Sequence, residues 1–201
     1  MKTEITTIGS IDAIILGDSS KKVFLFVHGQ GGNKEEAIPF AEIAIPKGYQ
    51  VIGIDLPVMD QPWEVLAMLN EVKEYLYQNY DSVSIRANSI GAWFSLLSFQ
   101  DRVIVQALFV SPILNMRVFI EGMQEKDEAY YDWVIKHPIE QWTADTFVLR
   151  PKIDIVVNDK VYDSFLSKFE CQVQEVENGE HWFHTPEQLL TMQQWEKSVI
   201  R

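Results

Sequence analysis

Ser89 is the residue of this chain whose surroundings best fit a nucleophile. The alternating apolar residues of 83–87 predict a buried strand, and the apolar residues after Ser89 recur at helical spacing. A serine at a sharp turn from strand to helix is well placed to attack a carbonyl carbon, and the small neighbours Ala87 and Gly91 leave room for such a turn. The start of the following helix would stabilise the negative charge that develops during acyl transfer.

A serine hydroxyl is a weak nucleophile, so it needs a base, and histidine is the side chain best suited to take its proton near neutral pH. The chain has four histidines. His181 and His184 lie in a loop after the last expected strand, where Gly179 supplies a turn that could bring a ring over the edge of the sheet. We favour His181, because His184 lies closer to the start of the final helix, and we keep His184 as the alternative.

A buried carboxylate usually holds the tautomer of such a histidine. Asp159 follows an expected strand at 152–157 and is our first choice for this carboxylate. Its alternative role is to cap the helix that begins near residue 160. Asp163, four residues later, is a possible substitute. Asp154 is a poorer candidate, because it would lie inside the expected strand as part of its alternating pattern.

The elements that must position these residues alternate between strand and helix. Apolar periodicity, glycine turns and proline positions predict strands at 3–8, 11–16, 23–27, 50–54, 83–87, 103–110, 152–157 and 171–176. The same signals predict helices at 34–47, 61–79, after Ser89, at 161–169 and at 185–199. This order indicates an α/β fold with a mostly parallel central sheet of about eight strands, flanked by helices. Ligands of such folds bind beyond the carboxyl ends of the strands, which is where the candidate residues would lie.

Length and composition limit the classes of function. A chain of 201 residues with 47% hydrophobic and 23% charged residues is typical of one soluble globular domain. The net charge of −12 argues against nucleic-acid binding and against binding to an anionic membrane. The single cysteine, Cys171, allows no intramolecular disulfide, and no apolar run approaches the roughly 20 residues that span a bilayer. We therefore expect a cytoplasmic protein that acts on a small molecule, and the oligomeric state stays open.

Four short motifs each follow an expected strand, and together they resemble the α/β-hydrolase superfamily over nearly the full length. They are Val27-His28-Gly29-Gln30-Gly31-Gly32, Ala87-Asn88-Ser89-Ile90-Gly91, Val157-Asn158-Asp159-Lys160-Val161 and Gly179-Glu180-His181-Trp182-Phe183. The order serine, acid, histidine belongs to that architecture. The resemblance implies that Ser89 attacks an acyl carbonyl, that His181 moves the proton, and that Asp159 orients His181. It also implies that the oxyanion is held by the backbone N–H groups of Gln30 and Ile90, and that His28 is structural.

The segment 113–149 lies where this superfamily inserts its cap, and here the cap is short. Apolar rings dominate the segment, which favours a small to medium apolar acyl pocket. The candidate walls are Met116, Phe119, Trp133 and Trp142; alternatively, these side chains simply pack the cap onto the sheet. The chain has no cluster with metal-ligand spacing and no cofactor motif, so we expect neither a metal nor a cofactor.

The resulting hypothesis is a serine hydrolase that cleaves a small to medium carboxylic ester or thioester through an acyl-enzyme on Ser89. One alternative is a peptidase or amidase that uses the same residues. Another is a non-catalytic binding protein that has the same fold. A His181 ring beyond hydrogen-bond reach of both Ser89 and a carboxylate would favour the binding protein.

Overall fold

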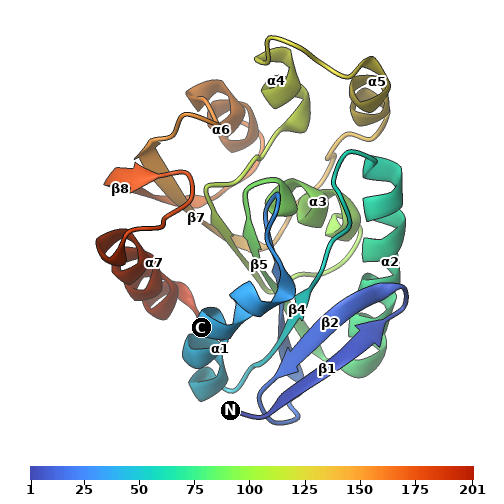
Figure 1. The fold of residues 1–201 in the computed structure, drawn as a ribbon, viewed down its shortest axis with the longest axis vertical. Coiled ribbons are helices and arrows are strands. Elements are labelled where there is room, and N and C mark those ends of the chain that lie inside the picture. Colours follow the sequence, from blue (N-terminus) through green and yellow to red (C-terminus); the bar gives the residue numbers. More distant parts are fainter.

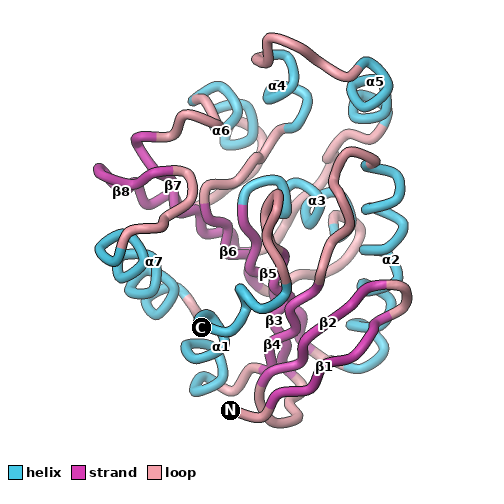
Figure 2. The backbone as a smooth tube through the Cα atoms, viewed as in Figure 1, coloured by secondary structure: helices cyan, strands magenta, loops and turns pink.

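The computed structural model describes all 201 residues and contains one eight-stranded sheet with helices on both faces (Figures 1 and 2). The strand order is β1-β2-β4-β3-β5-β6-β7-β8, in which only the pairs β1–β2 and β2–β4 are antiparallel. The strands are β1 (Thr3–Ile8), β2 (Ile11–Leu16), β3 (Lys22–Val27), β4 (Gln50–Ile54), β5 (Ser82–Asn88), β6 (Gln106–Val110), β7 (Asp145–Ile153) and β8 (Gln172–Glu180). The expected α/β fold with a mostly parallel sheet is confirmed.

Seven α-helices connect and cover these strands. They are α1 (Ala37–Ala44), α2 (Pro62–Asn79), α3 (Ser89–Phe99), α4 (Met116–Glu121), α5 (Glu128–Lys136), α6 (Asp159–Leu166) and α7 (Pro186–Val199). Short 3-10 turns flank α1 at Lys34–Glu36 and Ile45–Lys47. The expected single helix at 34–47 is therefore three consecutive helical pieces. Pro46 lies in the second 3-10 turn, which ends at Gly48 in the left-handed conformation.

The central strands are buried on both faces, as expected for a parallel sheet that lies between two helical layers. One core cluster of 39 buried residues includes side chains of α2, α3 and α6. A second cluster of 18 buried residues lies on the opposite face and includes side chains of α1 and α7. The two layers are visible on either side of the sheet in Figure 1.

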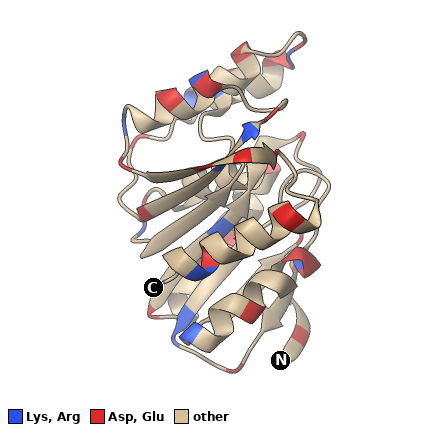
Figure 3. Cartoon of the chain, turned by 90° about the vertical axis from the view of Figure 1, so that its left-hand side faces the viewer, with Lys and Arg blue, Asp and Glu red and all other residues tan.

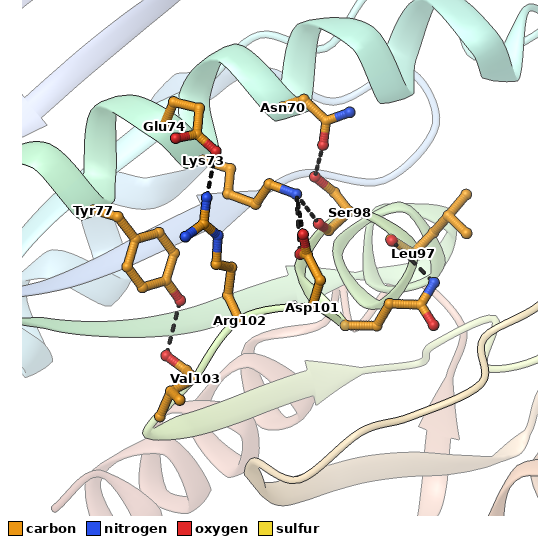
Figure 4. A network of polar contacts seen from close by, with 10 residues as sticks. Asn70, Lys73, Glu74, Tyr77, Leu97, Ser98, Asp101, Arg102 and Val103 are labelled. Carbon is orange, nitrogen blue, oxygen red and sulfur yellow. Dashed lines mark hydrogen bonds and ion pairs between the residues drawn. The ribbon is translucent and has the colours of Figure 1, made fainter.

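The helical layer beside α3 is reinforced by a buried lysine near the carboxyl end of that helix (Figure 4). Lys73 of α2 is 7% exposed, and its Nζ donates to the Ser98 carbonyl at 2.8 Å and to Asp101 Oδ1 at 3.0 Å. A cation suits this position, because the last carbonyl groups of a helix carry partial negative charge. The contact joins α2 to the end of α3 that is far from Ser89.

The boundaries of β7 differ from the expected ones, and the difference matters for the site. The sequence pattern predicts a strand at 152–157, but β7 runs from Asp145 to Ile153 and pairs with β6 from Gln106 to Val110. The last five residues of the expected cap segment 113–149 are therefore sheet, and its helices are α4 and α5 alone. β6 also begins later than expected, because Val103 and Val105 are exposed rather than buried.

Acidic residues, coloured red in Figure 3, are distributed along the chain and do not gather on one element. This distribution accords with a net charge of −12. None of the helices combines the length and the hydropathy that crossing a bilayer requires.

The loop after β3 packs directly on the first turn of α3, and Gly91 makes this approach possible. A Cβ atom at position 91 would lie 2.2 Å from the His28 carbonyl oxygen and 3.0 Å from that of Val27. Both neighbours are backbone atoms, which cannot move aside as a flexible side chain can. Glycine at this position therefore allows the loop of residues 28–32 to lie next to Ser89.

We expect Gly91→Ala to lower the free energy of unfolding by about 1–3 kcal/mol, although alanine favours helices more than glycine does. The measurement is urea unfolding followed by circular dichroism. Gly48→Ala is the control, since no atom lies within 4 Å of its added Cβ and only the left-handed backbone, at φ +88°, opposes it. A loss at Gly91 no larger than the loss at Gly48 would contradict the proposed close packing.

Candidate active site

Ser89 lies at the junction of β5 and α3 with an unusual backbone. Its φ is +48°, in the left-handed region that residues other than glycine seldom adopt. The strand ends at Asn88 and the helix begins at Ser89, so the chain turns within one residue. The Ser89 carbonyl accepts a hydrogen bond from the Ile113 N–H at 3.0 Å, which ties the turn to the segment after β6. This is the geometry that the sequence predicts for residues 83–97.

The Ser89 hydroxyl belongs to a chain of hydrogen bonds that runs through a histidine to a carboxylate. Ser89 Oγ lies 2.9 Å from His181 Nε2. On the other side of the imidazole ring, His181 Nδ1 lies 3.1 Å from Asp154 Oδ1 and 3.0 Å from Asp154 Oδ2. When Nδ1 carries the proton and donates a hydrogen bond to Asp154, Nε2 is free to accept the proton of Ser89. The structure thus brings together Ser89 and His181, as expected, with a carboxylate that was not the first choice.

Asp154 is well suited to hold this ring. The side chains of Asp154 and His181 are only 4% and 5% exposed. Asp154 Oδ1 also accepts hydrogen bonds from the N–H groups of Val156 at 2.8 Å and Val157 at 2.9 Å. The backbone of its own loop thus fixes the carboxylate in the orientation that contacts His181. Water is largely excluded from this position.

The expectation that Asp159 contacts His181 is wrong. Asp159 is the first residue of α6, its side chain is 83% exposed, and its ion-pair partner is Arg150. The cause is the boundary of β7, which ends at Ile153. Asp154 is consequently the first residue beyond the carboxyl end of β7, whereas Asp159 lies five residues further and begins the next helix. The alternative acid Asp163 is exposed on α6 and does not join the chain of hydrogen bonds.

The loop after β8 presents His181 and keeps His184 away from Ser89. Phe183 is 2% exposed, belongs to the core cluster that includes α1 and α7, and has a φ of +44°. This buried ring anchors the loop between two histidines that differ in environment. The His184 side chain is 59% exposed, with its Nδ1 3.5 Å from Glu180 Oε2. His181 is therefore the histidine of the site, and the alternative His184 is not.

His28 has a structural position beside the site. Its Nδ1 lies 2.7 Å from the Gly29 carbonyl oxygen and its Nε2 accepts a hydrogen bond from the Leu56 N–H at 2.9 Å. The ring is 2% exposed and joins the loop after β3 to the loop after β4. Both nitrogens are engaged by the backbone, so His28 is not available to Ser89.

An ion pair anchors the other end of the loop after β3. Asp55, directly after β4, accepts hydrogen bonds from Lys34 through the backbone N–H at 2.6 Å and through Nζ at 2.5 Å. Burial alone would raise the pKa of Asp55, but the two hydrogen bonds from Lys34 prevail and lower it below its usual value. The glycine-rich loop of residues 29–32 is thus held at both ends, by His28 and by Lys34.

The two expected oxyanion donors belong to segments that lie next to Ser89. A Cβ at Gly29 would be 3.1 Å from Ser89 Cβ, so the loop that carries Gln30 passes beside the serine. The Gln30 N–H donates to no backbone or side-chain acceptor. Ile90 lies in the first turn of α3, where backbone N–H groups have no acceptor within the helix. Both groups are therefore placed where they could bind a ligand, and their role stays a prediction.

The expected apolar pocket walls mostly serve as packing. Met116 is 2% and Trp142 is 8% exposed, and both belong to the core cluster that includes α2 and α3. Trp142 donates from Nε1 to Thr146 Oγ1 at 2.7 Å. The ring of Trp133 stacks on His137 at 3.9 Å, and Phe119 is partly buried against the same cluster. Met116 and Trp142 therefore fit the alternative, in which these side chains pack the cap onto the sheet.

The structure also has a polar cleft, which neither Ser89 nor His181 lines. A cleft of about 620 Å³ lies between α4, the end of β7 and the start of α6, and Asp154 is part of its wall. Charged side chains dominate the lining, including Glu121, Arg150, Lys152, Asp159 and Lys160. None of the four expected wall residues lines it. Nowhere in the structure do three or more His, Cys, Asp or Glu side chains gather in a group that could hold a metal ion.

Comparisons with known proteins bear on the fold. No protein-family model and no curated protein sequence matches the chain. Among solved structures, Est1E from Butyrivibrio proteoclasticus has a TM-score of 0.78 at 14% identity, covering 98% of this chain and 96% of that chain. XC6422 from Xanthomonas campestris, described as an α/β serine hydrolase without lid, has a TM-score of 0.73 at 13% identity, covering 98% and 93%.

A third similar structure is a thermophilic esterase from Thermogutta terrifontis with butyrate bound. It has a TM-score of 0.72 at 12% identity, covering 98% of this chain and 91% of that chain. Sequence identities this low establish a shared architecture and not a shared activity. The similarity extends over nearly the whole of each chain. The chain therefore has the α/β-hydrolase fold.

Proposed function

We propose that this protein is a serine hydrolase that cleaves carboxylic esters or thioesters through an acyl-enzyme on Ser89. The observation that carries the proposal is the continuous chain from Ser89 Oγ through His181 to Asp154, with separations of 2.9 and 3.0 Å. Nucleophile, base and orienting acid all lie within hydrogen-bond distance, as this chemistry requires. The fold that the chain shares with esterases makes such a reaction a reasonable expectation.

In the first half of the proposed reaction, Ser89 Oγ attacks the acyl carbonyl carbon while His181 Nε2 takes its proton. Asp154 accepts the hydrogen bond from Nδ1–H and stabilises the cation that forms on the ring. The negative oxygen of the tetrahedral intermediate would be held by the N–H groups of Gln30 and Ile90. When the intermediate collapses, the bond to the alcohol or thiol breaks, and His181 gives its proton to that leaving group.

In the second half, water replaces the leaving group. His181 Nε2 takes a proton from water, the hydroxide attacks the acyl carbon, and the bond to Ser89 Oγ breaks. The proton returns to Ser89, so the enzyme is restored and a carboxylic acid is released. The same residues could cleave an amide, and turnover of an amide over its matching ester would reveal a peptidase or amidase.

The distances also bear on the alternative of a non-catalytic binding protein. That reading would be favoured by a His181 ring beyond reach of its two partners, and here the ring is within reach of both. The polar cleft beside Asp154 carries no argument about the substrate, because neither Ser89 nor His181 lines it. A cytoplasmic location, and the absence of nucleic-acid and membrane partners, stay predictions from composition and charge.

We expect a fluorophosphonate probe to label the protein once, on Ser89, and Ser89→Ala to be unlabelled. The same variant should lower kcat for nitrophenyl acetate and butyrate by at least about 10³-fold, because it removes the nucleophile. Butyrate is a sensible first acyl group, since the Thermogutta terrifontis esterase was solved with butyrate bound. Mass spectrometry of the labelled peptide locates the adduct.

Ser95→Ala is the matched control, because Ser95 is a buried serine of the same helix whose hydroxyl donates to the Gly91 carbonyl. It should be labelled at the wild-type rate. No labelling of the wild type, or equal labelling of Ser89→Ala, would refute the proposal.

We expect Asp154→Asn to lower kcat by about 10³–10⁴-fold, because an amide cannot hold the His181 tautomer as a carboxylate does. Asp159→Asn removes an exposed ion pair with Arg150 and should change kcat by less than about threefold. The measurement is steady-state hydrolysis of nitrophenyl butyrate, with circular dichroism to verify folding. If Asp159→Asn proved as damaging as Asp154→Asn, the assignment of the acid would fail.

A further inference from the structure

A buried ion pair lies three residues before Ser89, and the proposed chemistry does not use it. Arg86 of β5 and Glu196 of α7 each have side chains that are 2% exposed, and Arg86 Nε donates to Glu196 Oε1 at 2.8 Å. Burying two charges is costly, and an apolar pair of similar volume is often at least as stable. Stability alone therefore does not explain the presence of this pair in the core.

The remaining donors of Arg86 are directed at the residues that precede the serine. Nη1 donates to Asn88 Oδ1 at 2.5 Å and to the Ala87 carbonyl at 3.1 Å. Nη2 contacts Met192 Sδ of α7 at 3.4 Å. The guanidinium also lies over the ring of Phe26 in β3, 5.4 Å from its centroid. The planar group thus connects the last two residues of β5 to α7 in a fixed geometry.

The same helix holds the loop that carries His181. Gln188 of α7 donates from Nε2 to the Asn178 carbonyl at 2.8 Å, and its Oε1 accepts from the His184 N–H at 3.2 Å. These two contacts flank His181 on both sides in the sequence. Because α7 contacts Arg86 and this loop at once, it is a common support for the two residues that must meet at 2.9 Å.

Arg86 and burial act in opposite directions on the Glu196 carboxyl. The pKa of this carboxyl lies above its usual value, because burial outweighs the charge and the hydrogen bond of Arg86. If only Arg86 were replaced, the carboxyl would lose the cation that opposes burial. A test of the pair must therefore remove both charges together, so that no charge is left alone in the core.

We propose that Arg86 and Glu196 are positioning residues that hold Asn88, and through it Ser89, at the correct distance from His181. This inference rests on the proposed function, in which Ser89 is the nucleophile. Neither side chain touches the reacting atoms. The pair would act through Asn88 on the serine, while Gln188 on the same helix sets the position of the histidine loop.

The test compares the wild type with Arg86→Met/Glu196→Leu, in which both charges are gone. We expect a melting temperature close to that of the wild type, because the apolar pair fills the same core. We expect kcat for nitrophenyl butyrate, and the rate of fluorophosphonate labelling, to fall about tenfold or more, because a small displacement of the nucleophile slows the attack. KM should change by less than about twofold, because both side chains are buried and neither touches the reacting atoms.

Two further variants separate positioning from stability. Asn88→Ala removes the acceptor of Arg86 Nη1 without leaving a charge unpaired in the core, and we expect it to lower kcat by about threefold or more at a similar melting temperature. Lys73→Met is the control, since it removes a buried cation whose partner Asp101 is 57% exposed, at the far end of α3 (Figure 4). It should lower the melting temperature and leave kcat within about twofold.

The outcomes are distinct. A wild type that is never labelled would refute the proposed function itself. A labelled wild type together with a double variant of unchanged kcat would overturn the positioning role. If the double variant does not fold, Asn88→Ala decides, because an unchanged kcat in that variant overturns the role equally. A fall of kcat in Lys73→Met as large as in the double variant would also overturn it, since the effect would then follow stability alone.

Discussion

The hydrogen bond between Ser89 Oγ and His181 Nε2 joins residues 92 positions apart, and the rest of the structure serves to make that contact. Ser89 follows β5, Asp154 follows β7, and His181 follows β8. Because β5 to β8 run parallel as neighbours, their carboxyl ends meet at one edge of the sheet. Each residue needs to project only a short way from its strand, so the sheet itself supplies most of the precision.

Ser89 and His181 could be found from the sequence because each has a local signal. Small residues surround the serine, and the histidine follows the last expected strand closely. The turn expected at Gly179 is wrong, because β8 continues through Gly179 to Glu180. Asp154 could not be found in this way, because Ile155, Val156 and Val157 continue the apolar character past the end of the strand. Pairing of Phe147 with Leu108 decides where β7 lies, and that pairing is a long-range contact that no local pattern reveals. Because β7 ends at Ile153 and not at Val157, the first acid after the strand is Asp154 and not Asp159.

The pocket illustrates the same limit. The rings of the cap segment look alike in the sequence, yet Trp142 is a core residue with a hydrogen bond to Thr146. The polar cleft is built from α4, β7 and α6, which are separate in the chain and meet only in the folded protein.

The buried ion pair has the same origin. In the sequence, Arg86 is an unexpected charge inside a strand that is otherwise apolar, and only the structure places Glu196 beside it. Helix α7 then connects the strand of the nucleophile to the loop of the base.

The most direct test of the central claim is a crystal structure of the protein after reaction with a fluorophosphonate. We expect a covalent bond from phosphorus to Ser89 Oγ and a phosphonyl oxygen about 3 Å from the N–H groups of both Gln30 and Ile90. The His181 ring should still lie between Ser89 and Asp154. An adduct on another residue, or a phosphonyl oxygen that faces solvent with neither N–H group in reach, would contradict the proposed site.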